Sequence, residues 1–267
     1  MARPLDSEHP GRFSSSLVAG LAMLTCFSPN HPVRGIADMA EELDLGRSTT
    51  HRYATTLVML GYLEQGPKRK YMLSPRASDF GLSVLDMILV RRVAREHLRF
   101  LRDKVGRTVS LGLLDGAEVA YVDRWPGSRQ GQYAVDQGIG VGTRVPVHCS
   151  AAGKALLASM PAAEQHKIVS RLQLKRHGPK AIATKKALRA ELEEIGAHGF
   201  AIEDEELIVG RRALAAAVVD GEGRAVAAVE LAVPSRVCAS ELMAGTFGCE
   251  VMVATQRIAS EMAEGPR

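Results

Sequence analysis

Hydrophobic positions near the start of the chain repeat at the spacing of α-helices. Leucines follow the serine cluster at 14–16 every three or four residues, and such a cluster is a typical helix start. A second apolar stripe predicts a helix over 34–43. A third helix is expected over 47–60, and Gly61 ends it. The short link between the second and third helices indicates a helix-turn-helix.

Two short segments with strand character follow the third helix. They cover 62–65 and 70–73, and a Gly-Pro turn separates them, which predicts a β-hairpin. Helix, helix, tight turn, helix and hairpin is the element order of a winged helix-turn-helix domain. We therefore assign residues 14–75 to such a domain and treat residues 1–13 as a disordered tail.

The rest of the chain mixes helical and strand patterns. A helical stretch over 76–105, broken at Arg91-Arg92, predicts a linker at 76–90 and the first helix of a second domain, 91–267. Strands are expected over 109–114, 118–122, 132–135, 200–203, 213–219 and 225–233. Helices are expected over 150–159, 162–172, 185–198 and 240–262. Interleaved hairpins and helices indicate an α+β fold and not a doubly wound parallel sheet.

The third helix has two different faces when its residues are placed 100° apart. The face expected to pack on the first two helices carries Thr50, Tyr53, Ala54, Leu57 and Leu60. The opposite face carries Arg47, Ser48, His51, Arg52 and Thr55. A recognition helix needs such a face, because its polar side chains reach base edges and its cations meet phosphates.

Basic residues are concentrated around this helix and the hairpin. The chain has a net charge of only +4, which is weak evidence for a nucleic-acid partner. Between Gly46 and Arg76, however, Glu64 is the single acid. Ser48 and Thr49 can offer hydroxyls to a phosphate at the helix N-terminus. Further phosphate contacts are expected from the hairpin tip, at Lys68, Arg69 and Lys70.

Composition narrows the class of protein. Hydrophobic residues make up 46% and charged residues 24%, as in ordinary globular proteins. The four cysteines lack the short spacing of a zinc or redox motif, so we expect reduced thiols in the cytoplasm. No apolar run is long enough to span a membrane. We expect no metal and no cofactor.

Several ordered segments resemble the IclR family of bacterial transcription regulators. In the first domain these are 16–24 and the recognition segment 43–52. In the second domain they are 145–158, 199–206 and 210–216. The resemblance covers nearly the whole chain. It implies operator DNA and a small-molecule effector as partners, and a GAF-like effector domain with a mixed sheet.

The same resemblance implies homodimers, often paired into homotetramers, on palindromic or repeated operators. Effectors of such regulators are commonly carboxylates or aromatic acids. Position by position, it implies a pocket lined by Val145, Ala151, Ala152, Glu203, Arg211, Ala213, Glu230 and Ala232. Arg211 could bind a ligand carboxylate or could pair with Glu230. A buried Glu230 disfavours an anion, so a polar or cationic ligand stays open.

Two other classes of function have candidate residues. A metabolite-converting enzyme with an accessory helix-turn-helix could use His148 and Cys149, but adjacent residues of an expected strand point to opposite faces. Cys149 could alternatively serve a redox sensor. Gly153-Lys154 lacks the glycine and hydroxyl residue of a phosphate-binding loop. The acidic run 203–206 is interpreted as a solvated loop or pocket rim and not as a metal site.

Overall fold

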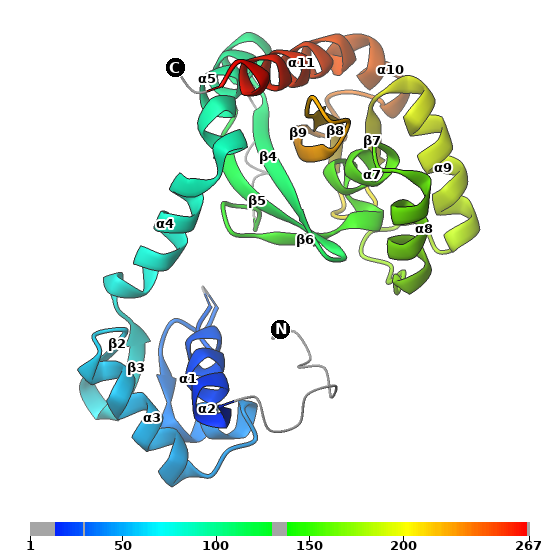
Figure 1. Ribbon diagram of the computed structural model, residues 1–267. Coiled ribbons are helices and arrows are strands. Elements are labelled where there is room, and N and C mark those ends of the chain that lie inside the picture. The colour runs from blue at the N-terminus through cyan, green and yellow to red at the C-terminus, as the bar shows by residue number, and fades with distance from the viewer. Residues whose placement is uncertain (1–13, 29, 130–137, 266–267) are drawn as a thin grey trace. The chain divides into compact units, whose positions relative to one another are not determined.

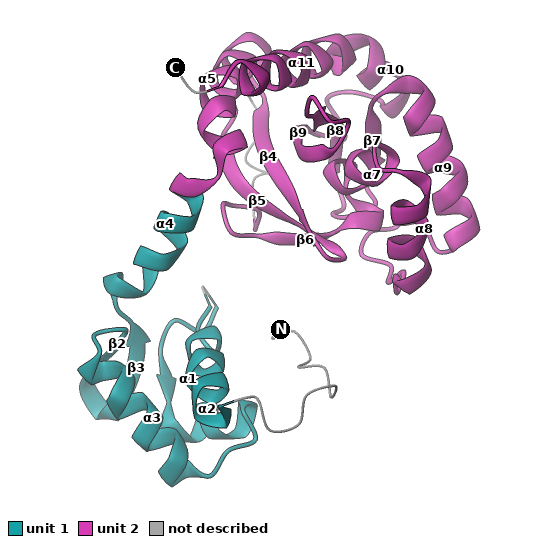
Figure 2. Cartoon of the chain, viewed as in Figure 1, with its two compact units in different colours: residues 1–85 teal, residues 86–267 magenta. Residues whose placement is uncertain are grey.

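The computed structural model describes residues 14–28, 30–129 and 138–265. The expected tail at 1–13 and the expected strand at 132–135 lie outside these ranges. The chain divides into two compact units, residues 1–85 and 86–267 (Figure 2). Each unit has its own sheet and its own core, so each is described separately.

The first unit contains the predicted helix-turn-helix and hairpin. Its elements are α1 (Ser15–Thr25), β1 (Arg34–Gly35), α2 (Ile36–Glu42), α3 (Arg47–Met59), β2 (Leu63–Gln65), β3 (Lys70–Leu73) and all but the last two residues of α4 (Asp79–Met87), with 3-10 turns at Pro67–Arg69 and Pro75–Ser78 (Figure 1). The three short strands form one antiparallel sheet in the order β1-β3-β2. The winged helix-turn-helix order expected from the sequence is confirmed.

The start of the second helix differs from the sequence prediction. Arg34 and Gly35 belong to a strand, because they pair with Tyr71 and Lys70 of β3. The helix begins only at Ile36, where the Asp38 carboxylate accepts the Gly35 N–H at 2.8 Å. This contact caps the helix N-terminus and joins it to the sheet.

The helices of the first unit pack around an aliphatic core. Met23 of α1, Met39 of α2 and Ala54 of α3 have no exposed surface. Leu60 was expected on this packing face, but half of its surface is exposed. The reason is that α3 ends at Met59, so Leu60 is the C-cap and lies beyond the regular helix.

The second unit is built on a six-stranded sheet. Its helices are α5 (Leu89–Val105), α7 (Ala151–Ala158), α8 (Ala162–Arg171), α9 (Lys185–His198), α10 (Ser240–Met243) and α11 (Cys249–Glu264), with a 3-10 turn at Val147–Cys149 and a π-helical turn at Ala244–Gly248. Its strands are β4 (Thr108–Asp115), β5 (Glu118–Trp125), β6 (Arg144–Pro146), β7 (Ala201–Asp204), β8 (Arg211–Val219) and β9 (Ala225–Pro234). The long helical stretch breaks at Ile88, not at Arg91-Arg92 as predicted; Ile88 is extended and caps α5.

The strands follow the order β6-β5-β4-β9-β8-β7 (Figure 1). The α+β class is confirmed. The family resemblance implied a mixed sheet, with parallel as well as antiparallel pairs, and the structure differs from this. Every pairing between the described strands is antiparallel. Tight hairpins explain this, since β4 is joined to β5 and β8 to β9 by short turns.

Helices cover both faces of this sheet. Ala213 and Ala215 of β8 belong to the apolar cluster that includes α7 and α9. Leu214, which points to the other face, is equally buried, and α5 and α11 pack on the sheet and on each other. The face toward α7 is therefore an interior space where charged side chains have no solvent. No described helix is both long and apolar enough to cross a membrane.

Candidate functional site

The polar face of α3 is exposed, as its helical spacing predicts. Arg47, Ser48, His51, Arg52 and Thr55 are exposed, and Thr49 is half-buried. On the other face, Thr50 and Ala54 have no exposed surface. Within the part of the chain that the structure describes, the two arginines of this face form no ion pair. Their charges are available to phosphates.

The hairpin tip presents two further exposed cations. Lys68 and Arg69 lie in the turn between β2 and β3, and both have a φ of 55°. Lys70 has a different environment, because its ammonium lies 3.3 Å from the Asp38 carboxylate that caps α2. Lys68 and Arg69 are therefore exposed cations, whereas Lys70 also connects the hairpin to α2 through its ion pair with Asp38.

The interior of the second unit contains a buried ion pair centred on Arg211, the first residue of β8. Its guanidinium has no exposed surface. Nη1 lies 2.5 Å from the Glu203 carboxylate of β7, and Nη2 donates to Glu230 of β9. Arg211 and Glu230 thus pair with each other, which was one of the two alternatives left open by the sequence.

Glu230 is held by two more donors. The Tyr121 hydroxyl of β5 donates to Oε1 at 2.7 Å, and the Ala152 N–H donates to Oε2 at 3.1 Å. Ala152 lies in the first turn of α7, where free N–H groups and the helix dipole favour a negative charge. We call Tyr121, Glu203, Arg211 and Glu230 the buried quartet.

The electrostatics of the buried quartet follow from burial and from unequal charge. Burial raises the pKa of Glu203, although Arg211 opposes this. Burial would lower the pKa of Arg211, but the carboxylates of Glu230 and Glu203 outweigh it and raise the pKa. Burial and the Glu230 charge raise the pKa of Tyr121. One guanidinium is therefore shared by two carboxylates, and it stays charged.

The structure brings four of the eight expected pocket residues into contact, namely Glu203, Arg211, Glu230 and the backbone of Ala152. The other four, Val145, Ala151, Ala213 and Ala232, belong to the surrounding apolar cluster. Sequence reasoning missed Tyr121. The sequence did contain a hint, because Tyr121 follows Val119 by two residues on β5. The two side chains therefore lie on the same face of the strand, which pairs with β4.

A second buried cation lies beside the quartet. The Lys154 ammonium of α7 is 2.5 Å from Glu191 of α9, 2.5 Å from Glu206 and 2.7 Å from the Ile202 carbonyl oxygen. Burial lowers the pKa of Lys154, but the two carboxylates outweigh this and raise it. Burial raises the pKa of Glu206 to about 7, and the charges of Glu191 and Glu203 add to this, although Lys154 opposes it.

The run 203–206 was interpreted as a solvated loop or a pocket rim, and the solvated loop is wrong for two of its residues. Glu203 has no exposed surface and Glu206 is 6% exposed. Asp204 faces the other side of β7 and pairs with Lys180 and Arg212. The members of the run pair with different cations, namely Lys154, Lys180, Arg211 and Arg212.

His148 and Cys149 lie in a 3-10 turn and not in a strand, so the expected alternation does not apply to them. His148 contacts the Lys175 carbonyl oxygen through Nε2 at 2.9 Å, and burial lowers its pKa. Cys149 has no exposed surface, and burial raises its pKa to about 12. At neutral pH the thiol stays protonated, which makes it a poor nucleophile and a poor redox sensor.

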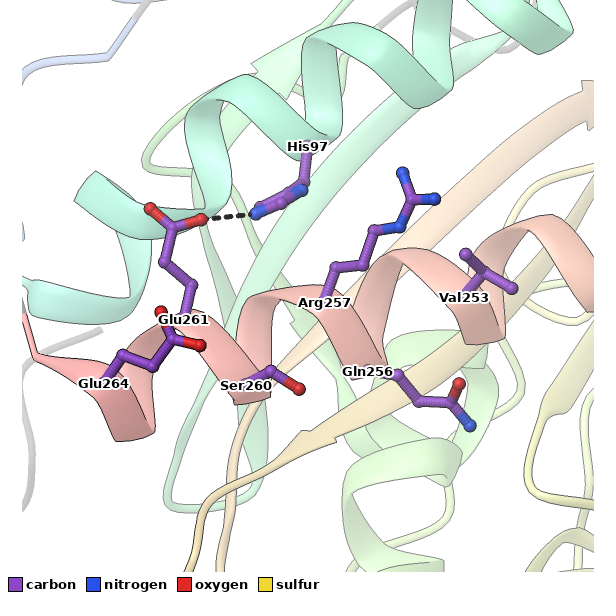
Figure 3. Close-up of a pocket in the computed structure, with 7 residues that line it drawn as sticks. All are labelled: His97, Val253, Gln256, Arg257, Ser260, Glu261 and Glu264. Atoms are coloured by element: carbon purple, nitrogen blue, oxygen red, sulfur yellow. Dashed lines mark hydrogen bonds and ion pairs between the residues drawn. The ribbon is translucent and has the colours of Figure 1, made fainter.

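An open groove of about 610 Å³ runs along α11 beside α5. Figure 3 shows its lining, in which the His97 imidazole and the Glu261 carboxylate face each other at 2.8 Å. Val253 adds one apolar side chain. None of the site residues expected from the sequence lies in this groove, so it is separate from both candidate sites.

Comparison with family models decides between the classes of function. The model of the IclR helix-turn-helix domain matches residues 16–67. The model described as bacterial transcriptional regulator IclR C-terminal matches residues 82–258, which is more than half of the chain. The chain belongs to the IclR family. It is a ligand-responsive, DNA-binding transcription regulator, and it is not an enzyme.

Matches to other transcription regulators extend over most of the chain. The HTH-type transcriptional regulator XynR of Escherichia coli (strain K12) is 32% identical over 85% of this chain and 89% of its own. A transcriptional regulator from Rhodococcus sp. RHA1 has 32% identity and a TM-score of 0.83, covering 95% and 100% of the two chains. An IclR homolog from Microbacterium hydrocarbonoxydans, solved with 4-hydroxybenzoate, has 25% identity and a TM-score of 0.78, covering 92% and 98%.

Proposed function

We propose that this regulator reads its operator with the exposed face of α3. His51 contacts base edges in the major groove, Arg47 and Arg52 contact phosphates, and the Ser48 hydroxyl contacts a phosphate at the helix N-terminus. Lys68 and Arg69 contact the backbone beside the groove. The single observation that supports this assignment is the contrast between the two faces of α3: one is largely buried, and the other is exposed, with cations that form no ion pair among the described residues.

We further propose that the protein works as a homodimer in the cytoplasm, where its operator lies. A dimer places two recognition helices in adjacent major grooves, about one helical turn apart. Large apolar side chains remain exposed on two helices of the first unit, including Leu17 and Leu21 of α1 and Phe80 and Leu82 of α4. Such exposure is typical of surfaces that a second copy covers. Paired dimers would give the tetramer implied by the family resemblance.

For the effector we propose the buried quartet as the binding site and a small acid as the ligand. Glu230 places a carboxylate between Arg211, the Tyr121 hydroxyl and the Ala152 N–H. These donors would serve a ligand carboxylate in the same way. The Arg211 Nε atom is buried and has no hydrogen-bond partner in the described part of the chain, so the guanidinium has one unused donor. An acid that binds here must displace the Glu230 carboxylate.

The related Microbacterium hydrocarbonoxydans protein was solved with 4-hydroxybenzoate, which supports an aromatic or aliphatic acid. The opposite choice is a cationic ligand. It is favoured by one observation, that two buried carboxylates share the single guanidinium of Arg211. The two ligand classes differ in what they do to Glu230, because an acid replaces its carboxylate whereas a cation binds to it.

Removing the internal carboxylate tests the site. In Glu230→Ala, the donors of Arg211, Tyr121 and Ala152 lose their acceptor, so the protein should be less stable. Acetate at tens of millimolar should restore part of the lost stability by occupying the vacated place, since a bound ligand stabilises by mass action. Thermal unfolding with and without acetate measures this. Glu191→Ala is the matched control, because it removes a carboxylate from the neighbouring Lys154.

The acid proposal fails if acetate stabilises wild type, Glu191→Ala and Glu230→Ala equally. A cationic effector is indicated instead if small amines stabilise the wild type and lose this effect in Glu230→Ala. The regulatory role is tested by a gel shift on the DNA upstream of the chain's own coding region. A ligand that stabilises the second unit should change operator affinity. Binding that shows no sequence preference at moderate salt would contradict the operator proposal.

A further inference from the structure

A second cavity lies in the effector domain, away from the buried quartet. It has a volume of about 530 Å³, which is in the range of small-molecule sites. It is bounded by the end of α5, by the segment after β5 and by the chain from Val237 to Glu250. None of the pocket residues expected from the sequence lines this cavity.

A buried guanidinium with an unused donor lies in this cavity. Arg107 is only 8% exposed, and its Nη1 atom is buried and has no hydrogen-bond partner among the residues that the structure describes. The exposed Arg129 also lines the cavity. Burial lowers the pKa of Arg107, and the neighbouring Arg129 charge lowers it further. A buried cation without an acceptor is costly unless a ligand supplies one.

The acidic side chain that lines this cavity, Glu250, already forms an ion pair. Its carboxylate pairs with the Lys104 ammonium at 2.7 Å. Within the described residues, Arg107 and Arg129 form no ion pair. Glu250 therefore balances the charge of Lys104, and the charges of Arg107 and Arg129 remain unbalanced within the described residues.

The backbone around Arg107 holds the two arginines together. The Arg129 N–H donates to the Gly106 carbonyl oxygen at 3.2 Å, and the Gly127 N–H donates to the Thr108 hydroxyl at 2.9 Å. A Cβ atom on Gly127 would lie 2.6 Å from the backbone of Arg107, so only glycine allows this approach. The segment after β5 is therefore fixed against the start of β4.

The opposite wall is apolar and is also anchored. Val237 and Leu242 line the cavity with 42% and 63% of their surfaces exposed, and Phe247 lies beside them. The loop that carries Val237 is held by Arg212, whose guanidinium donates to the carbonyl oxygens of Ser235 and Cys238. A ligand with an apolar body would remove this apolar surface from water.

We propose that this cavity is a second ligand site, and that it binds a small organic acid with its carboxylate on Arg107 and Arg129 and its apolar body against Val237, Leu242 and Phe247. The guanidinium fork matches a carboxylate, which accepts two parallel N–H donors. An inorganic anion would satisfy the charge but leave the apolar wall exposed. The proposal does not depend on the effector assigned to the buried quartet.

The site is tested by titrating the full-length protein with benzoate and hexanoate at fixed ionic strength. The chain has a single tryptophan, Trp125, which precedes the Gly127–Arg129 segment and reports binding by its fluorescence; calorimetry gives an independent affinity. Arg107→Met should weaken both acids about tenfold, because it removes a charge-assisted contact worth about 1.4 kcal/mol. Arg129→Met should weaken them about threefold, since this side chain is exposed.

Two variants make the result specific. Arg99→Met removes an exposed arginine of α5 that pairs with Glu96, and it should bind both acids as the wild type does. Tyr121→Phe removes a donor of the buried quartet and should also leave this binding unchanged. If Arg107→Met fails to fold by circular dichroism, Arg129→Met and the reversed charge of Arg129→Glu provide the test.

The proposal is overturned by any of four results, of which the first three concern the acids themselves. The acids fail to bind the wild type, they bind Arg107→Met and Arg129→Met as tightly as the wild type, or they are weakened only by Tyr121→Phe, which places them in the buried quartet. Inorganic phosphate that competes as strongly as benzoate would also contradict it, because the apolar wall would then contribute nothing.

Discussion

The polar face of α3 and the buried quartet both rely on arginines, but these arginines have opposite environments. Arg47 and Arg52 are exposed and carry no ion pair among the described residues. Arg211 has no exposed surface and binds two carboxylates. An exposed arginine stays hydrated, so its charge costs little free energy and can bind a partner. Arg211, which is buried, is instead needed to offset the charges of Glu203 and Glu230. The same residue type therefore serves recognition in one unit and internal charge balance in the other.

Removing the charge of Arg211 should have the largest effect. Arg211→Met leaves Glu203 and Glu230 buried without a cation, and breaking a buried pair in this way costs about 3–5 kcal/mol. Urea unfolding of the second unit measures the loss. A variant that also carries Glu203→Gln and Glu230→Gln should recover most of it. A loss below about 1 kcal/mol would show that Glu203 and Glu230 do not depend on the Arg211 charge.

Glu206 makes the stability of the second unit depend on pH. Its pKa is raised from 4.5 to about 7, so the folded protein binds this proton more tightly than the unfolded chain. The resulting stabilisation is complete below about pH 4.5 and is lost as pH rises through 7. At 1.36 kcal/mol per pKa unit, the loss reaches about 3 kcal/mol.

Urea unfolding at several pH values from 5 to 8.5 checks this expectation, with Glu206→Gln as the comparison. The glutamine cannot ionise, so its stability should change less with pH than that of the wild type. Equal pH profiles of the two proteins would mean that another group causes the dependence.

The two kinds of contact on α3 should separate by their dependence on DNA sequence. Arg52→Ala removes a phosphate contact, so it should weaken operator and random DNA alike and reduce the slope of log affinity against log salt by about 1. His51→Ala should instead relax the preference at one base pair, worth about 1–3 kcal/mol. Fluorescence anisotropy on operator, point-mutated operator and random DNA distinguishes them. Equal losses on all three DNAs for both variants would contradict the division.

The smallest effect is expected at Cys149. Its thiol is buried and has a pKa of about 12, so it should resist oxidants at neutral pH. Operator affinity of the wild type should be unchanged by hydrogen peroxide, and Cys149→Ser should behave in the same way. An oxidant response that disappears in Cys149→Ser would revive a redox role for this residue.

The surface of α3 could be predicted because a helix encodes its faces locally. A step of 100° per residue places Arg52 and Ala54 on different sides without any knowledge of the rest of the fold. The same reasoning failed at Leu60, since it depends on where the helix ends. It also failed at Arg34, whose strand pairing is set by Tyr71 far along the chain.

The buried quartet was only partly predictable. The family resemblance supplied Glu203, Arg211 and Glu230, but the sequence could not show that they pair. A charged run such as 203–206 is ordinarily solvated, and its burial depends on Lys154 and Arg211, which no local pattern links to it. Tyr121 joins the quartet only because β5, β4 and β9 lie side by side in the sheet.

Opposite charges at consecutive positions also fix how β7 and β8 align. Glu203 and Arg211 pair on one face of the sheet, while Asp204 and Arg212 pair on the other. Because neighbouring residues of a strand point to opposite faces, sliding β7 by one residue would exchange the faces of both acids. Asp204 would then enter the interior with a shorter side chain, and Glu203 would leave it. The two ion pairs are therefore compatible with only one register of β7 and β8. The other facing residues of these strands are alanines and larger aliphatics, which would tolerate a shift more easily.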